Sequence, residues 1–248
     1  MPEKAPSGLA SLTSVAPMDS PAAQRPGTAA ALLGLFAFAS CYFRSFAFPH
    51  LPFMPGGDQI GFFTSGSRMV AGQLPYHDFF EILPVGTDLA YTALIKLFGF
   101  YTWVPGAVMA FLAAGIVILI TLAAARIMRG LAIVIPGLLL LGFLLLDESL
   151  NATHHWFCTL AAMAAMFVLL RDVSLPRIAA AGALAGLATS FTQTTGAFLV
   201  IGLAIYVAWK SKRTRAGASW RKPLLLCAVA IAVFFAINGY FIWQAGLR

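Results

Sequence analysis

Charged side chains are scarce in this sequence. They make up 10% of its 248 residues, whereas 60% of the residues are hydrophobic. A soluble domain usually carries about 25% charged residues, which cover its surface. The shortage, together with long apolar runs, excludes a soluble globular domain and indicates a polytopic membrane protein.

Cysteine is scarce as well. Cys41, Cys158 and Cys227 each lie inside an apolar run. Their spacing fits neither a zinc site nor a redox-active pair. We therefore interpret all three as small buried hydrophobic residues.

Acidic residues are few compared with basic ones, and the formal net charge is +7. Such an excess can indicate nucleic-acid binding, but no groove of aromatic and basic residues and no binding motif is visible. The basic residues fall in short clusters between apolar runs, which is typical of the determinants of membrane topology. We therefore expect a lipid bilayer and no nucleic acid as partner.

The chain begins with a segment, 1–27, that is rich in Pro, Ala and Ser and predicts a disordered cytoplasmic tail. Residues 28–248 then form a single membrane module. Ala37-Phe38-Ala39 in its first run faintly matches a signal cleavage site, but the long preceding tail favours an uncleaved anchor.

Seven apolar runs predict transmembrane helices, although the shorter ones are marginal for a hydrocarbon core that needs about 20 residues. The runs are 28–48, 103–125, 130–146, 156–170, 178–192, 195–209 and 223–245. The fifth and sixth predict a tight helical hairpin around Gln193-Thr194. Gly182 and Gly186 form a GxxxG pattern, which lets helices approach closely.

The run 86–101 contains Asp88 and Lys96, and it could cross the membrane or lie along its surface. If it lies flat and the N-terminus is cytoplasmic, every basic connection faces the cytoplasm, as the positive-inside rule requires. We therefore expect an interfacial amphipathic helix and a large outer loop at about 49–102. The predicted fold is an all-α bundle of about seven transmembrane helices, with juxtamembrane helices in this loop.

The outer loop contains Asp58, Asp78 and Glu81, three of the nine acidic residues. Asp58 follows Gly56-Gly57 and is well placed to cap a short helix that runs to about Gly72. A capping role and a catalytic role for Asp58 are compatible, and the residues leave both open.

A second outer segment, 147–156, holds two acids and two histidines between apolar runs. Polar groups at membrane depth are costly and tend to be functional. His154 and His155 could bind a divalent metal together with a carboxylate, although adjacent histidines on a helix face different directions. The alternative is a polar loop among the lipid headgroups.

The cations on this side of the membrane are Arg44, Arg68 and Lys96. Each of them could pair with a phosphate. The alternative is that the long side chains reach toward anionic headgroups.

Two stretches, MVAGQLPYHDF (69–79) and LPVGTDLAYTALIKLFG (83–99), resemble the polytopic GT-C glycosyltransferases. The resemblance is to the bacterial branch similar to protein mannosyltransferases and aminoarabinose transferases. The order of the family's motifs is matched by Gly72, Pro75, Tyr76, Asp78, Pro84 and Leu97-Phe98-Gly99. The segment 181–208 is similar to the family's hairpin of small residues.

The resemblance implies about seven membrane helices, with juxtamembrane helices in the first outer loop. It places the catalytic base at Asp58 and implies a polyprenyl-phosphate sugar as donor, with a glycan, lipid or protein as acceptor. The candidate catalytic residues are Asp58, Asp78, Glu81 and His155. The candidates for binding the substrate or its phosphate are Arg68, Lys96, Tyr76, His154 and Gln193.

The sequence departs from the family in three ways. His154-His155-Trp156 stands where many relatives carry a second acid, and the hairpin turn has Gln193 where relatives often have Lys. Relatives are also usually longer, so the chain is interpreted as a fragment, a protein completed by another chain, or one that no longer catalyses. The alternative function is a transporter or assembly subunit in the inner or plasma membrane.

Overall fold

The structure is a computed structural model of the chain. It describes residues 26–48, 51–52, 57–146, 151–213 and 220–246. The disordered tail predicted for 1–27 lies outside these residues, except for Pro26 and Gly27, which begin the first helix.

The described part of the chain is almost entirely helical, which confirms the all-helical fold class. Two very short strands, β1 and β2, pair in an antiparallel manner after the first helix. The elements in order are α1 (Pro26–Ser45), β1 (Phe46–Phe48), β2 (Leu51–Pro52), α2 (Asp58–Val70), α3 (Gly86–Phe98), α4 (Trp103–Ala124), η1 (Gly130–Val134), α5 (Ile135–Leu146), α6 (His154–Arg171), α7 (Leu175–Phe191), α8 (Gln193–Arg213) and α9 (Arg221–Gly246).

Five of these helices, α1, α4, α6, α8 and α9, are long and apolar enough to cross a membrane. Two further apolar helical segments are shorter, namely Gly130–Leu146 and Leu175–Phe191. A helix of 17 residues spans about 26 Å, which is less than the roughly 30 Å of a hydrocarbon core. The chain is therefore an integral membrane protein with five long apolar helices and two shorter ones beside them.

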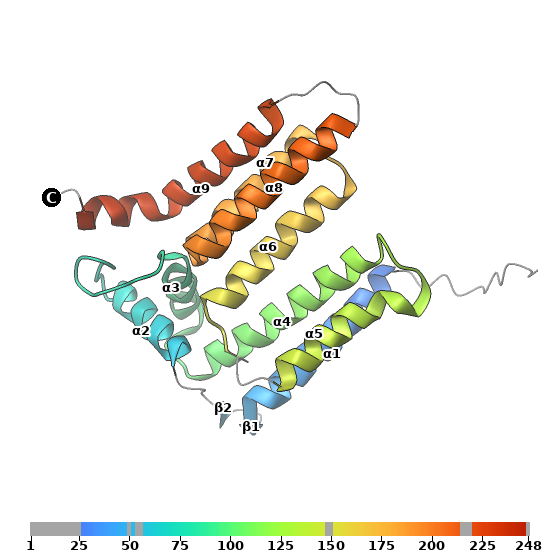
Figure 1. Cartoon of the computed structure of the whole chain (residues 1–248). Coiled ribbons are helices and arrows are strands. Elements are labelled where there is room, and N and C mark those ends of the chain that lie inside the picture. Colours follow the sequence, from blue (N-terminus) through green and yellow to red (C-terminus); the bar gives the residue numbers. More distant parts are fainter. Residues whose placement is uncertain (1–25, 49–50, 53–56, 147–150, 214–219, 247–248) are drawn as a thin grey trace, which may run out of the picture.

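The apolar helices run back and forth between two faces of the bundle (Figure 1). We call the face that carries α2, α3 and the start of α6 the loop face, and the opposite one the basic face. The basic face carries the following residues at or near helix ends: Arg126, Arg129, Arg171, Arg177, Lys210, Lys212, Arg213, Arg221 and Lys222.

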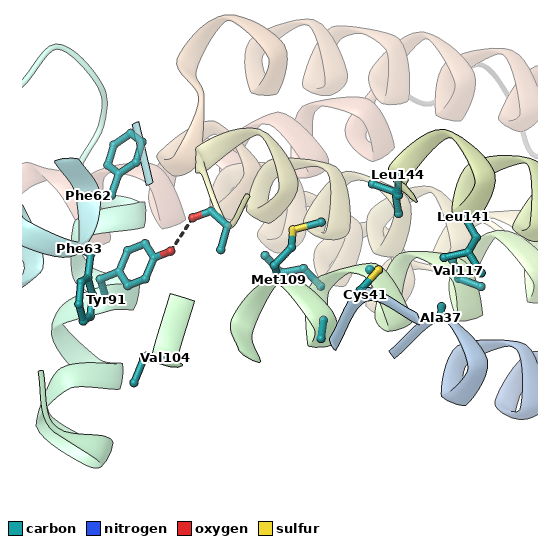
Figure 2. Packing of buried hydrophobic residues seen from close by; sticks show 14 of the residues in the cluster. Ala37, Cys41, Phe62, Phe63, Tyr91, Val104, Met109, Val117, Leu141 and Leu144 are labelled. Carbon is teal, nitrogen blue, oxygen red and sulfur yellow. Dashed lines mark hydrogen bonds between the residues drawn. The ribbon is translucent and has the colours of Figure 1, made fainter. Parts of the chain in front are cut away.

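The hydrophobic core near α1 is formed by small and branched residues (Figure 2). Ala37 of α1 lies beside Val117 of α4 and Leu141 of α5, and Cys41 of α1 belongs to the same cluster. These side chains are almost entirely buried, which in an apolar bundle reflects close packing between helices. The burial of Cys41 and Cys158 agrees with their interpretation as small hydrophobic residues.

The small residues of α7 allow it to pack closely against α9. A methyl group built on Gly182 would lie 2.7 Å from the carbonyl oxygen of Leu226. One built on Gly186 would collide with the carbonyl oxygen of Ala230. The GxxxG pattern therefore serves a close helix approach, and its partner is α9.

The hairpin predicted around Gln193-Thr194 is confirmed. Thr192 is the single residue between α7 and α8, and α8 begins at Gln193. Gly196 of α8 lies against the backbone of Thr189, so a side chain at this position would collide with α7. The turn is tight because Gly196 lets the two helix ends meet.

The segment that contains α2 and α3 is attached to the bundle at the start of α3. Asn238 of α9 accepts a hydrogen bond at Oδ1 from the backbone N–H of Val85 (3.1 Å) and donates one from Nδ2 to Ser190 Oγ (3.0 Å). Gly86 lies so close to α7 that a methyl group on it would sit 2.7 Å from the carbonyl carbon of Ser190. The N-terminus of α3 is thus fixed to α7 and α9.

The prediction that Asp58 caps α2 is wrong in detail. Gly57 occupies the N-cap position, and no side chain caps the helix by a hydrogen bond. Gly57 has φ 83°, a left-handed conformation that favours glycine. Asp58 is the first helical residue, and at this position its negative charge still interacts favourably with the helix dipole. The helix ends at Val70, two residues before the predicted end.

Candidate functional site

Five of the nine predicted site residues lie in two groups that are separated along α2, and the second group also contains Asp88. Asp58 begins this helix and Arg68 lies in its last turn, which places them about 15 Å apart along the axis. We call Asp58, His154 and His155 the histidine group. We call Tyr76, Glu81 and Asp88 the acidic group.

The histidine group lies where α2 meets the start of α6. His154 is buried, and the centre of its ring lies 5.3 Å from that of Phe62. Its neighbour His155 is exposed, and the centres of the two histidine rings are 3.9 Å apart. The side chain of Asp58 is exposed, and its negative charge acts on His154. His154 Nδ1 is buried and has no hydrogen-bond partner among the described residues.

The segment before α6 is held by both juxtamembrane helices. The Tyr91 hydroxyl of α3 donates to the carbonyl oxygen of Ala152 at 2.6 Å, the bond drawn in Figure 2. The backbone N–H of Ala152 donates to Oε1 of Gln59 in α2 at 2.8 Å. Both partners are buried, so the position of His154 is fixed relative to Asp58.

The sequence allows a metal site at His154 and His155. Among the residues with described positions, no three His, Cys, Asp or Glu side chains are grouped closely enough to hold a metal ion. The two acids of the segment 147–156, Asp147 and Glu148, lie outside the described residues.

Arg68 and Asp78 hold the turn that follows α2. Arg68 Nε donates to Gln73 Oε1 at 2.6 Å and Nη2 donates to the Asp78 carbonyl at 3.3 Å, while the guanidinium lies 4.3 Å from the centre of the Phe79 ring. Asp78 Oδ2 accepts the backbone N–H of Leu74 at 2.7 Å.

The same Asp78 carboxylate lies 2.7 Å from His77 Nδ1. The backbone hydrogen bond from Leu74, followed by the contact with His77, lowers the pKa of Asp78. Both predicted residues, Arg68 and Asp78, therefore have a structural part in forming the turn.

Tyr76 and Glu81 hold the second half of the loop. Tyr76 has φ 67°, which is strained for a residue with a side chain, and its hydroxyl donates to the Leu83 carbonyl at 2.5 Å. Glu81 Oε1 accepts the backbone N–H groups of Ile82 (2.9 Å) and Leu83 (3.1 Å). Burial, followed by the charges of Glu81 and Asp88, raises the pKa of Tyr76.

Asp88 lies in the first turn of α3 and is completely buried. Neither of its carboxylate oxygens receives a hydrogen bond from a donor in the described part of the chain. Its carboxyl does lie within hydrogen-bonding reach of Glu81. Burial, followed by the charge of Glu81, raises the pKa of Asp88 to about 8. At neutral pH this carboxyl therefore holds a proton.

A groove of about 590 Å³ opens beside the acidic group. It lies between the loop and the C-terminal end of α9, and its lining residues are Tyr76, His77, Asp78, Phe79, Phe80, Glu81 and Ala245. The Phe80 side chain is exposed, so the groove combines an aromatic ring with two carboxyl groups. Such a surface can bind a ligand that has hydroxyl groups and a nonpolar face.

The two remaining predicted residues lie elsewhere on the structure. Lys96 is exposed in the last turn of α3, about 12 Å along the axis from Asp88. Gln193 is exposed as the first residue of α8. The predicted residues thus share one face of the bundle without converging on a single point.

Sequence reasoning missed Asp88 as a site residue. It treated the residue as one charge of an amphipathic helix, which would place it toward water. The available signal was an acid in the first turn of an otherwise apolar helix. The start of α3, where Asp88 lies, is attached to Ser190 and Asn238, which are far away in the sequence.

Comparison of the chain with protein-family models, with curated proteins and with solved structures gave no match.

Proposed function

We propose that the chain is an integral-membrane glycosyltransferase, or the membrane module of one. In this proposal a sugar moves from a polyprenyl-phosphate donor to a hydroxyl acceptor at the loop face. The observation that carries it is the one-sided distribution of groups able to exchange protons. Asp58, Glu81 and Asp88 lie at the loop face, whereas the basic face carries most of the cations.

The topology follows from the same asymmetry. Cationic connections are retained in the cytoplasm, which places the basic face and the N-terminus inside and the loop face outside. With α5 and α7 counted as spans, the bundle crosses the membrane seven times, as in the GT-C fold. A lipid-phosphate donor fits this arrangement because its tail would lie in the bilayer and its phosphate at the level of α2 and α3.

The chemistry needs a base and a partner for the leaving group. The acceptor hydroxyl loses its proton as its oxygen bonds to the anomeric carbon, and a carboxylate within reach can accept that proton. Asp58 is the first candidate because its carboxylate is exposed at the loop face. A single displacement of this kind inverts the anomeric configuration.

The lipid phosphate leaves as an anion, which a nearby cation or hydrogen-bond donor stabilises. Lys96 is exposed and is the simpler candidate for this role. Arg68 would have to reach the phosphate while holding Gln73 and the Asp78 carbonyl. In this proposal the exposed His155 contacts the donor or acceptor beside Asp58, and the buried His154 packs behind it.

A transporter or assembly subunit is the alternative. A translocation path usually requires ionisable residues within the membrane-spanning helices. In the described part of the chain, the Asp, Glu, Lys, Arg and His side chains lie at or near the ends of the apolar helices or in the connections between them. This distribution favours chemistry at the membrane surface.

The test supplies the purified full chain in membranes with a panel of labelled polyprenyl-phosphate hexoses and pentoses. We expect Asp58→Asn to lower transfer by at least about 100-fold, which is the usual contribution of a general base. Asp172→Asn is the matched control, because this carboxylate lies at the end of α6 on the basic face. Equal transfer by wild type and Asp58→Asn would remove Asp58 from the mechanism, and no transfer by the wild type would contradict the proposal.

A further inference from the structure

The acidic group contains a carboxyl for which the surrounding fold provides no donor. Asp88 is 0% exposed, and both of its oxygens are without a hydrogen-bond donor among the described residues. A charged carboxylate in such a place would be strongly destabilising unless it were paired. A protonated carboxyl avoids this cost and can itself donate one hydrogen bond.

Glu81 is the acceptor within reach of that proton. Its Oε1 already receives two backbone N–H groups, from Ile82 and Leu83, and these orient the carboxylate. The Tyr76 hydroxyl fixes the same stretch of loop by donating to the Leu83 carbonyl. Because both members of the pair are carboxyls, a hydrogen bond between them requires one proton.

Among the described residues, no cation acts on the Asp88 carboxyl in place of this proton. His77 lines the groove together with Glu81, but its ring contacts the Asp78 carboxylate. From α7 and α9 the polar neighbours at the start of α3 are Ser190 and Asn238, which are uncharged and bonded to each other. From the loop, Tyr76 lies near the pair, and its hydroxyl already donates a hydrogen bond to the Leu83 carbonyl. Within α3 itself, Thr87 Oγ1 is buried and has no hydrogen-bond partner in the described ranges.

Only one member of the pair reaches the outside. Glu81 lines the groove between the loop and Ala245 of α9, whereas Asp88 is sealed behind it. A proton on the pair can therefore exchange with water or with a hydroxyl group in the groove, through Glu81. The exposed ring of Phe80, at 84% exposure, lines the same groove.

We propose that Glu81 and Asp88 form an acid–base pair that shares one proton and serves a polyhydroxylated ligand bound in this groove. Asp88 holds the proton, and Glu81 carries the negative charge that accepts a hydrogen bond from a ligand hydroxyl. The Phe80 ring offers a nonpolar surface to the carbon face of the same ligand. The pair lies beyond the opposite end of α2 from Asp58.

The identity of the ligand rests on the proposed function. In sugar transfer, the acceptor oxygen bonds to the anomeric carbon, the bond from that carbon to the phosphate oxygen breaks, and the phosphate leaves with the electron pair. The hydroxyl proton moves to Asp58, as in the proposed function, while Glu81 accepts a hydrogen bond from another hydroxyl group of the bound acceptor.

The first experiment needs no substrate. Infrared absorption of the purified full chain, in a detergent without ester or acid groups, detects the carbonyl band of a protonated carboxyl. We expect this band near neutral pH, and we expect it to disappear as the pH rises through about 8, the pKa of Asp88. Absence of the band in the wild type at pH 6 to 7, where roughly nine-tenths of such a group should be protonated, would overturn the proposal.

Two variants assign the band. Asp88→Asn should abolish the band, because the Asn amide takes the place of the protonated carboxyl and donates a hydrogen bond to ionised Glu81. In Glu81→Gln the band should disappear at a lower pH than in the wild type, because the Gln amide can donate a hydrogen bond to ionised Asp88. Asp172→Asn, on the basic face, should leave the band unchanged. A band that survives both variants of the pair at all pH values belongs to another residue and would also overturn the proposal.

The transfer assay separates this inference from the proposed function. If the band follows Glu81 and Asp88 but the wild type transfers no sugar, the pair stands and the glycosyltransferase proposal fails. If transfer occurs and no such band exists, the reverse holds. If both hold, Glu81→Gln should raise KM for the hydroxyl acceptor more than it lowers kcat, and an unchanged KM would contradict its part in ligand binding.

Discussion

Gly186 of α7 and Ala230 of α9 lie in direct backbone contact, so that any side chain on Gly186 would collide with the Ala230 carbonyl oxygen. Gly182, one turn earlier, approaches Leu226 in the same way. Without a hydrophobic driving force between helices in lipid, such close contact is a principal source of attraction. The α7–α9 pair is therefore a rigid part of the bundle, and it is this pair that holds the start of α3.

The first prediction concerns this contact. Replacing Gly186 by Leu should force α7 and α9 apart and lower the free energy of unfolding by at least about 1–3 kcal/mol, the usual effect of overpacking. Thermal unfolding of the purified chain in detergent measures the change. Gly202→Ala in α8 is the control, because no atom lies within 4 Å of the added methyl group. A Gly186→Leu variant as stable as the control would show that the two helices are not packed as described.

The second prediction concerns Asn238. Its replacement by Ala leaves the backbone N–H of Val85 buried without a partner, and we expect a loss of about 1–3 kcal/mol in stability. Limited proteolysis should also cut the loop between Gln73 and Val85 faster, because its attachment to α9 is weakened. Gln244→Ala, on the same helix, provides the comparison. Unchanged rates of cleavage would argue against Asn238 as the anchor of the loop.

The third prediction is a pH dependence that comes from Asp88. Its pKa is about 8 in the folded chain, compared with roughly 3.9 for an aspartic acid in an unfolded chain. Between these values the folded state keeps a proton that the unfolded state has released, so the wild type loses stability as the pH rises from about 4 to 8. The loss is at most about 1.4 kcal/mol for each pH unit.

Asp88→Asn should remove this dependence. Its melting temperature should exceed that of the wild type by an amount that increases with pH up to about 8 and is constant above it. Asp172→Asn should show the opposite pH dependence, with a melting temperature below that of the wild type at neutral pH and close to it at acidic pH. The reason is that hydrogen bonds from Ser174 lower the pKa of Asp172, so its contribution to stability is lost when it is protonated. A difference in melting temperature between wild type and Asp88→Asn that does not change with pH across this range would refute a buried, protonated Asp88.

The fourth prediction tests the topology. Single cysteines at Gln73 in the loop and Lys212 at the end of α8 should be labelled by a membrane-impermeant reagent from opposite sides. Both positions are exposed, and they lie on the loop face and the basic face respectively. The native Cys41, Cys158 and Cys227 are first replaced by Ala. Labelling of both positions from one side would contradict the arrangement of the helices in a membrane.

The helices were predictable because hydropathy is a local property. The runs 103–125 and 130–146 match α4 and the η1–α5 segment to within one residue at each end, and the turn at Gln193 lies where it was predicted. The start of α2 was predicted less well. Both Gly57 and Asp58 favour the beginning of a helix, and only the backbone conformation of Gly57 decides which residue caps it.

The candidate site was less predictable because its geometry is not local. Arg68 reads as a free cation in the sequence, but the turn folds back so that it contacts Gln73, the Asp78 carbonyl and the Phe79 ring. Asp88 reads as a surface charge, but it is completely buried at the start of α3, which is attached to α7 and α9. The family resemblance indicated which loop to consider, and the structure divides the residues of that loop between two groups.

The bond between Asn238 and Val85 has a consequence for the order in which the protein is assembled. A ribosome makes Val85 long before Asn238, since 153 positions separate them. The early loop consequently emerges without its anchor and stays unanchored while six further apolar segments are inserted. The start of α3 acquires this bond only after α9 enters the bilayer, so the attachment of the loop is a property of the completed bundle and of no earlier intermediate of its synthesis.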